Sequence, residues 1–229
     1  MTFLQDLHNP PPVNGTLEDH YQFFNSTNDM QQATFYISNP TVLTNGNFAT
    51  GGAVKTQADG DGAVFFTDWQ VHGASVATYT LTPTNYPAAS TIQSASPTFS
   101  RVQVSSYSTG DFYFYQRQST VRKYQQSPLT YGLQIKNNLS STVKIRMDIY
   151  SFYDGSDPVL KMGKPIYLKQ GVTRITSTIQ TDSLRDLTVG AAPYTEFRLV
   201  IMDLGAATAD FEMYYIKCEF GTISTILEG

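Results

Sequence analysis

The stretch TVKIRMDIYSFY, residues 142–153, contains the pattern on which the fold of this chain depends. Apolar residues alternate in it with polar or aromatic ones: Val143, Ile145, Met147 and Ile149 take turns with Lys144, Arg146, Asp148 and Tyr150. Successive side chains of a strand point to opposite faces, so a period of two predicts a strand with one face in a core and the other in water. The residues YDGSDP (153–158) then predict a turn, because Asp tolerates a tight backbone and Gly supplies a positive φ.

The chain beyond about residue 40 repeats this character in many short segments. They alternate or run apolar and are rich in β-branched and aromatic residues: YTLT (79–82), FSRVQV (99–104), DFYFYQRQ (111–118), TYGLQIKN (130–137), GVTRITSTIQ (171–180), EFRLVIMDL (196–204) and DFEMYYIKCEF (210–220). Clusters of Pro, Gly, Asn and Asp separate them, and no helical pattern longer than about two turns follows residue 40. We therefore predict an all-β chain whose residues 39–229 form one antiparallel β-sandwich or barrel.

The composition fits one large β domain and argues against a nucleic-acid partner. The chain has 229 residues, enough for one sandwich, and its 15 Tyr and 14 Phe are typical of pleated, half-buried surfaces. Only 15% of the residues are charged and the net charge is −4, so no nucleic-acid partner is expected, since phosphate contacts draw on clusters of Lys and Arg. Cys218 is the only cysteine, which excludes an intrachain disulfide and predicts a small buried thiol.

Nothing in the sequence resembles a membrane span, which needs about 20 apolar residues in a row. The N-terminal residues MTFLQDLHNPPP (1–12) lack the basic start and apolar core of a signal peptide. We therefore expect synthesis in the cytoplasm and no membrane partner. The Asn-x-Ser/Thr triplets at Asn14, Asn25 and Asn138 are then interpreted as chance matches.

Residues 1–38 differ in character from the rest and predict an attachment arm. Pro10, Pro11 and Pro12 impose an extended stretch, and Thr16 then opens a near capping box that predicts a short helix over about residues 17–24. A helix this short is not stable alone in water and must dock on this domain or on another subunit. The predicted docking residues are apolar side chains of the arm: Phe3, Leu4, Leu7, Leu17, Tyr21 and Phe24.

The sandwich is predicted to open with TVLTNGNF, residues 41–48. Asn45-Gly46 favours a reversal of the chain at the edge of the sandwich, and Phe48 is then expected to plug its end. A glycine-rich phosphate loop is excluded here, because no helical pattern follows it.

Four stretches together resemble the carbohydrate-binding-module-like jelly-roll domains of tail-fibre, head-fibre and accessory structural proteins of tailed bacteriophages. They are TVLTNGNF, FFTDWQVHG around Trp69, GVTRITSTI and FEMYYIKCEFGTIST, and the resemblance covers about residues 40–226. The opening has Asn47 where the family often has an acidic residue, and the GVTRI strand lacks the family's aromatic residue. The resemblance implies that residues 39–229 form a sandwich of the jelly-roll type, and the arm lies outside it.

The resemblance implies a non-enzymatic structural protein of a phage virion, on the head or the tail. The arm would dock on a capsid or tail protein, while the sandwich would form a homotrimer. Several weak sites on such a trimer would together bind a host-surface glycan through effective concentration. A freestanding carbohydrate-binding module is the alternative. A glycan-processing hydrolase is less favoured, because the chain is short for the parallel β-helix usual in phage depolymerases.

The segment DFYFYQRQ (111–118) is the candidate binding surface. If Phe112 and Phe114 face the core, alternation places the other side chains outward. The candidate ligand or interface residues are Asp111, Tyr113, Tyr115 and Arg117, with Trp69 added. Such an array suits a sugar, since Tyr rings stack on its apolar faces while Asp and Arg bind hydroxyls. It equally suits a subunit interface or a plain protein surface, because Tyr is favoured at interfaces for the same amphipathic reason.

The sequence predicts no catalytic residues, no metal and no cofactor. His8 and His20 lie in the arm, and His72 has no nucleophile motif beside it. The aspartates are scattered over turns and strand ends, where Asp normally serves the backbone: Asp148, Asp154, Asp157, Asp203 and Asp210. The stretch Asp59–Gly62 lacks the third acidic ligand and the closing Glu of a calcium loop.

Overall fold

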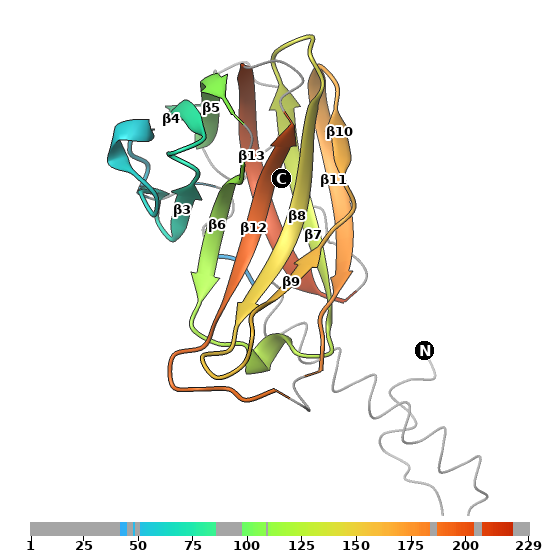
Figure 1. Cartoon of the computed structure of the whole chain (residues 1–229). Coiled ribbons are helices and arrows are strands. Elements are labelled where there is room, and N and C mark those ends of the chain that lie inside the picture. Colours follow the sequence, from blue (N-terminus) through green and yellow to red (C-terminus); the bar gives the residue numbers. More distant parts are fainter. Residues whose placement is uncertain are drawn as a thin grey trace, which may run out of the picture. The chain divides into compact units, whose positions relative to one another are not determined.

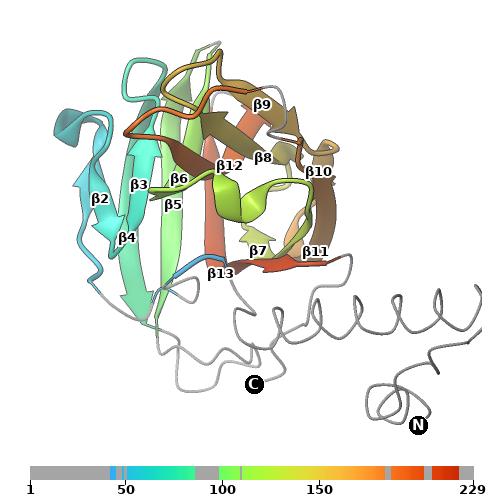
Figure 2. The same ribbon diagram turned by 90° about the horizontal axis from the view of Figure 1, so that it is seen from below.

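The computed structural model of the chain describes residues 42–44, 48, 51–85, 98–108, 110–183, 187–203 and 208–221. These residues form two antiparallel β-sheets that pack face to face, seen edge on in Figure 2 with β12 and β8 in one layer and β13 and β7 in the other. The predicted all-β jelly-roll sandwich is thereby confirmed. The predicted arm lies outside the described residues, and so do its expected helix and docking residues Phe3, Leu4, Leu7, Leu17, Tyr21 and Phe24.

The first sheet has six strands within the described part of the chain. In spatial order they are β1 (Lys55–Thr56), β4 (Ala77–Asn85), β5 (Thr98–Tyr107), β13 (Ala209–Phe220), β7 (Pro128–Asn137) and β11 (Gly171–Gln180). Its neighbouring strands pair antiparallel throughout.

The second sheet has seven strands within the same ranges. In spatial order they are β10 (Ile166–Leu168), β8 (Val143–Phe152), β12 (Tyr194–Asp203), β6 (Phe112–Gln118), β3 (Trp69–His72) and β2 (Val64–Phe66), and β9 (Val159–Met162) also pairs with β8. Figure 1 shows β6, β12, β8 and β9 of this sheet side by side. Two short 3-10 turns, η1 (Gln57–Asp59) and η2 (Arg122–Tyr124), lie in connections.

The core lies between the sheets and follows the period of two in the sequence. On β8 the apolar set Val143, Ile145, Met147 and Ile149 is buried, as predicted. The prediction that the opposite face of this strand is wet is wrong at Asp148, which is also buried. Its carboxylate accepts hydrogen bonds from Nε and Nη2 of Arg146, at 2.7 and 2.8 Å, and these bonds compensate for its burial.

The turn after β8 forms where predicted, but a different residue carries the unusual backbone. Asp154 has a φ of 54°, whereas Gly155 does not adopt a positive φ. The side chain of Asp154 connects this turn to the segment before β12, since its Oδ2 accepts the N–H of Ala192 at 2.9 Å. Gly155 is required for space instead, because a Cβ there would lie 2.9 Å from Cγ2 of Thr188.

The predicted plug is confirmed, because the Phe48 ring is fully buried against Phe66 and Trp69, at centroid distances of 5.1 and 5.7 Å. The preceding residues join the two sheets. The N–H of Val42 donates to the carbonyl of Cys218 on β13, and the N–H of Thr44 donates to Oε1 of Gln116 on β6. The expected reversal at Asn45-Gly46 lies outside the described residues.

Cys218 is buried, as predicted, and its burial raises the pKa of the thiol well above the ordinary value. This sulfur therefore stays protonated, and an unreactive thiol is expected. Among the described residues, no helix has the length and apolar character needed to cross a membrane.

Candidate functional site

The middle strands of the seven-stranded sheet carry an unusual set of side chains on their outward face. Strand register brings β6, β12 and β8 into line, so that Glu196 lies opposite Arg117 on one side and Tyr150 on the other. The set, here called the aromatic–arginine face, consists of Tyr113, Tyr115, Arg117, Tyr150, Phe152, Tyr194, Glu196 and Arg198.

Glu196 is the centre of this face and is only 3% exposed. Its Oε1 accepts hydrogen bonds from Nε and Nη2 of Arg117, at 3.0 and 2.5 Å. Its Oε2 accepts the corresponding bonds from Arg198, at 2.9 and 2.5 Å. Because one carboxylate is shared by two guanidiniums, this triad carries a net charge of +1 in the middle of the sheet.

The guanidinium of Arg198 lies in a stack of flat groups that runs across four strands. Arg198 lies over the ring of Tyr150 at 4.1 Å and over the ring of Tyr113 at 4.5 Å. The other side of the stack continues with His72, whose ring lies 4.6 Å from that of Tyr113. Cation–π and ring contacts of this kind hold all four groups in place.

The guanidinium of Arg117 lies in a second stack. Arg117 lies 4.1 Å from the centroid of Tyr194, and the Tyr194 ring in turn lies 4.9 Å from that of Phe152. On the β6 side the same guanidinium lies 5.9 Å from the centroid of Tyr115. Tyr150, Phe152 and Tyr194 are half-buried, so part of each ring meets solvent.

Tyr113 and Tyr115 face outward as predicted, but they do not form an open platform. Their side chains are only 8% and 7% exposed, because Arg198 and His72 cover the ring of Tyr113 and the two tyrosines pack on each other. Burial raises the pKa of Tyr113 to about 12, although the nearby Arg198 acts in the opposite direction. Neither ring can take a sugar on its face while these neighbours remain in place.

The remaining sequence candidates lie in three different environments. The Arg117 side chain is 47% exposed, and Asp111 is exposed just before β6. Trp69 is a correction, because its side chain is 1% exposed in the core and cannot stack on a surface ligand.

Strand β9 adds an apolar margin that the sequence analysis missed. Leu160 lies opposite Tyr150, and Met162 lies opposite Asp148. Their exposed fractions are 42% and 61%, so the half-buried rings continue into an apolar surface. The only sequence signal was the alternation in VLKM (159–162), which is too short to be distinguished from a loop.

In the stretch Asp59–Gly62 both carboxylates accept hydrogen bonds from backbone N–H groups. Oδ2 of Asp59 accepts the N–H of Thr56, and Oδ1 of Asp61 accepts the N–H groups of Gly73 and Ala74. Burial opposes these bonds to Asp61, but together with nearby His72 they lower the pKa of its carboxyl. No group of three His, Cys, Asp or Glu side chains in the described ranges is arranged to hold a metal ion.

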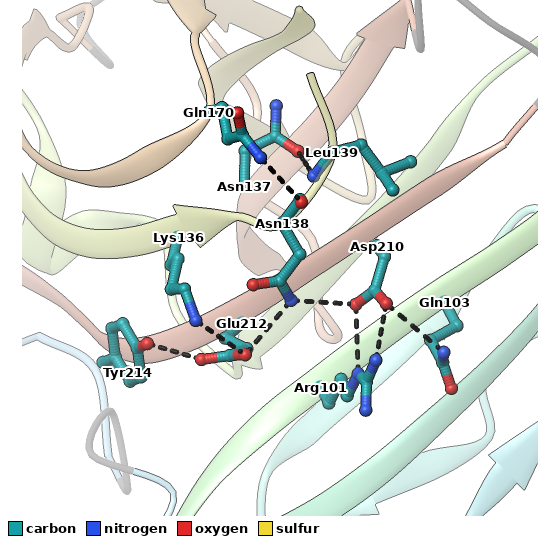
Figure 3. A network of polar contacts seen from close by, with 10 residues as sticks. All are labelled: Arg101, Gln103, Lys136, Asn137, Asn138, Leu139, Gln170, Asp210, Glu212 and Tyr214. Atoms are coloured by element: carbon teal, nitrogen blue, oxygen red, sulfur yellow. Dashed lines mark hydrogen bonds and ion pairs between the residues drawn. The ribbon is translucent and has the colours of Figure 1, made fainter. Parts of the chain in front are cut away.

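The outer face of the six-stranded sheet carries a second polar cluster, drawn in Figure 3. Arg101 on β5 donates from Nε and Nη2 to the carboxylate of Asp210 on β13, at 3.0 and 2.6 Å. Nδ2 of Asn138 bridges Asp210 and Glu212, and Lys136 pairs with Glu212 at 3.3 Å. The bonds link β5, β13, β7 and the loop after it, and each of the two carboxylates is engaged by donors from the chain itself. We interpret this cluster as structural.

The hydrogen bonds to the carboxylate of Asp210 make the free energy of unfolding depend on pH. Burial opposes the shift, but hydrogen bonds from Arg101 and Asn138 lower the pKa of Asp210 below its usual value. The ionised Asp210 carboxylate therefore adds to the free energy of unfolding at any pH above its pKa in the unfolded chain, about 3.9. This contribution is lost as the pH falls through its lower pKa in the folded protein. Asp210→Asn is expected to destabilise the protein by about 1 kcal/mol at pH 7, and urea unfolding should show the difference vanish near pH 2. The exposed Asp157→Asn should match the wild type at both values, and a persistent Asp210→Asn deficit at low pH would contradict the assignment.

No family model and no curated protein matches the chain. Solved structures do match it. An arabinose-bound GH51 α-L-arabinofuranosidase superposes with a TM-score of 0.54 at 15% identity, over 80% of this chain and 27% of that one. The Stig cyclase Fisc from Fischerella sp. TAU gives 0.49 at 11% identity, over 80% and 98%. The CBM22-1 xylan-binding domain of Xyn10C from Paenibacillus barcinonensis gives 0.44 at 10% identity, over 77% and 99%.

The chain thus spans about a quarter of the length of the arabinofuranosidase. The class that the fold defines is the antiparallel β-sandwich of the jelly-roll type. At these identities the likeness extends to the fold and no further, so any function must be argued from the chain's own residues.

Proposed function

We propose that the sandwich is a non-catalytic module that binds a carbohydrate on its aromatic–arginine face. A sugar presents apolar ring faces beside hydroxyl groups, and it needs aromatic or aliphatic surface next to hydrogen-bonding groups. The partly exposed rings of Tyr150, Phe152 and Tyr194 and the apolar Leu160 supply the first, and Arg117 supplies the second. This juxtaposition, in two neighbouring rows of strand partners (Leu160, Tyr150, Glu196 and Arg117 in one, Phe152 and Tyr194 in the other), is the observation that carries the proposal.

The chemistry of the face also favours binding over catalysis. Glycosidic cleavage needs one carboxyl as a proton donor and a second as base or nucleophile. On this face Glu196 is engaged by two guanidiniums and Asp148 by Arg146. Neither carboxylate is therefore free to serve as the acid, and the absence of enzyme activity stays a prediction.

The sequence resemblance supports the further proposal that the chain is a structural protein of a tailed-phage virion. In that role residues 1–38 would attach it to a capsid or tail protein, and a homotrimer would multiply weak glycan contacts. Light scattering of the full chain beside a chain beginning at residue 39 tests this role. A monomer in both cases would favour a freestanding carbohydrate-binding module, and a trimer in both would leave residues 1–38 for docking.

Tyr194→Ala is expected to weaken glycan binding about tenfold, because Tyr is enriched among the binding-site residues whose truncation costs more than about 1 kcal/mol. The measurement is binding of the full chain to a glycan array, followed by titration of the best ligand. Tyr167→Ala is the matched control. Tyr167 is 64% exposed on the same sheet but pairs with Lys144, six residues from Tyr150 along β8 and so roughly 20 Å away at about 3.4 Å per residue. An array without any bound glycan, or equal losses in both variants, would overturn the proposal.

A further inference from the structure

We infer that the ligand of the aromatic–arginine face is an acidic sugar chain, and that Arg117 binds the carboxylate of one of its uronic acid residues. The inference rests on the proposed carbohydrate binding and names the class of carbohydrate. It depends on the charge of the triad, on the geometry of the Arg117 guanidinium and on where the neighbouring acids lie.

The charge balance on the face leaves one cation in excess. Arg117 and Arg198 share the single carboxylate of Glu196, whereas Arg146 has Asp148 to itself. A net charge of +1 at the triad contrasts with the net charge of −4 of the whole chain. A neutral ligand would leave this cation without an anionic partner, and an acidic one would complete the pairing.

Arg117 is the member of the triad that is accessible to a ligand. Its side chain is 47% exposed, against 4% for Glu196 and 13% for Arg198. Nε and Nη2 donate to Glu196, which leaves three of its five N–H groups for other acceptors. Tyr194 lies over the flat face of the guanidinium at 4.1 Å, so a further acceptor must approach in the plane, which is how a carboxylate binds Arg.

The acidic residues near the face lie away from this position. Asp111 precedes β6 and is six residues from Arg117, which is roughly 20 Å along an extended strand. Asp61 pairs with His72, at the end of the other stack. Leu160 of the apolar margin lies in the same row of strand partners as Arg117. A sugar chain that crosses the strands along this row would place the apolar faces of its rings on β9 and β8 and a uronate carboxylate at Arg117 on β6.

A paired glycan array tests the inference on the full chain. Each uronate-containing oligosaccharide is printed beside its carboxyl-reduced form, in which the uronate has become a neutral hexose, and sulfated neutral glycans form a third arm. We expect the acidic member of at least one pair to bind about tenfold more tightly than the reduced member, with an affinity that falls as salt rises. Equal binding within every pair, or binding of the sulfated arm alone, would overturn this inference and leave carbohydrate binding intact. No binding anywhere would overturn both.

Variants then locate the contact on the best pair. Arg117→Lys keeps the charge but loses the planar fork, and Arg117→Met loses both. We expect about tenfold weaker binding of the acidic glycan for Arg117→Lys and a larger loss for Arg117→Met, with a clearly smaller loss for the reduced glycan in each variant, because it loses only a neutral hydrogen bond. Arg174→Gln, an exposed residue of β11 in the other sheet, is the control and should change neither. A melting temperature measured for each variant separates loss of contact from loss of fold, and equal losses on both glycans would contradict the assignment of Arg117.

Discussion

Glu196→Gln is expected to lower the free energy of unfolding by about 3 kcal/mol, since breaking a buried ion pair leaves an uncompensated charge. The amide that replaces the carboxylate has no charge to offer the two guanidiniums. Arg117 is half exposed and can turn to water, but Arg198 is largely buried between Tyr150 and Tyr113. The effect should therefore lie at the lower end of the range for such pairs.

The measurement is urea unfolding at neutral pH, supported by a fall in the melting temperature of about 10 °C for a domain of this size. The matched control is Asp182→Asn. This substitution removes the ion pair between Asp182 and Lys161, two exposed side chains. It should lower the free energy of unfolding by less than about 1 kcal/mol. If Glu196→Gln proves as mild as this control, the triad does not hold β6 and β12 together.

Phe48→Ala is expected to cost about 4 kcal/mol, within the usual range for truncating a buried Phe. The fully buried ring contacts Phe66 and Trp69. Its loss leaves a cavity against the rings of Phe66 and Trp69. Because Trp69 is the only tryptophan, its fluorescence reports on this site directly, and we expect a shift of its emission to longer wavelength.

Val54→Ala is the control for this substitution, since Val54 is exposed close by in the sequence and should change stability by less than about 0.5 kcal/mol. Unfolding in urea and the emission spectrum are measured for both variants. An unchanged spectrum in Phe48→Ala would mean that the ring does not seal the Trp69 site.

The layered β fold was predictable because its cause is local. The alternation in residues 142–153 identifies which side chains enter a core, whatever the partner strands are. The burial of Phe48 was predictable for a similar local reason. An aromatic residue that follows a predicted turn at the edge of the sandwich finds an apolar environment only at the end of that sandwich. The wet face of β8 was predicted wrongly at Asp148, because the residues opposite it, Arg198 on β12 and Met162 on β9, come from other strands that the local pattern does not identify.

The candidate site was predictable only in part. Alternation correctly places Tyr113, Tyr115 and Arg117 outward on β6, but it does not say what lies beside them. Their neighbours come from β12 and β8, and Arg117 and Glu196 are 79 residues apart in the sequence. A period of two assigns a face, whereas the identity of the neighbouring strand is a non-local property.

The sequence alone therefore determined that this protein is layered β structure and which side chains share a face on the longer strands, because side-chain direction repeats every two residues. Tertiary structure alone decided that one carboxylate lies between two guanidiniums and that Arg198 and His72 cover the ring of Tyr113. It also decided that Trp69 is buried in the core. Contacts across a sheet depend on strand order and register, and these are set by the packing of the whole domain.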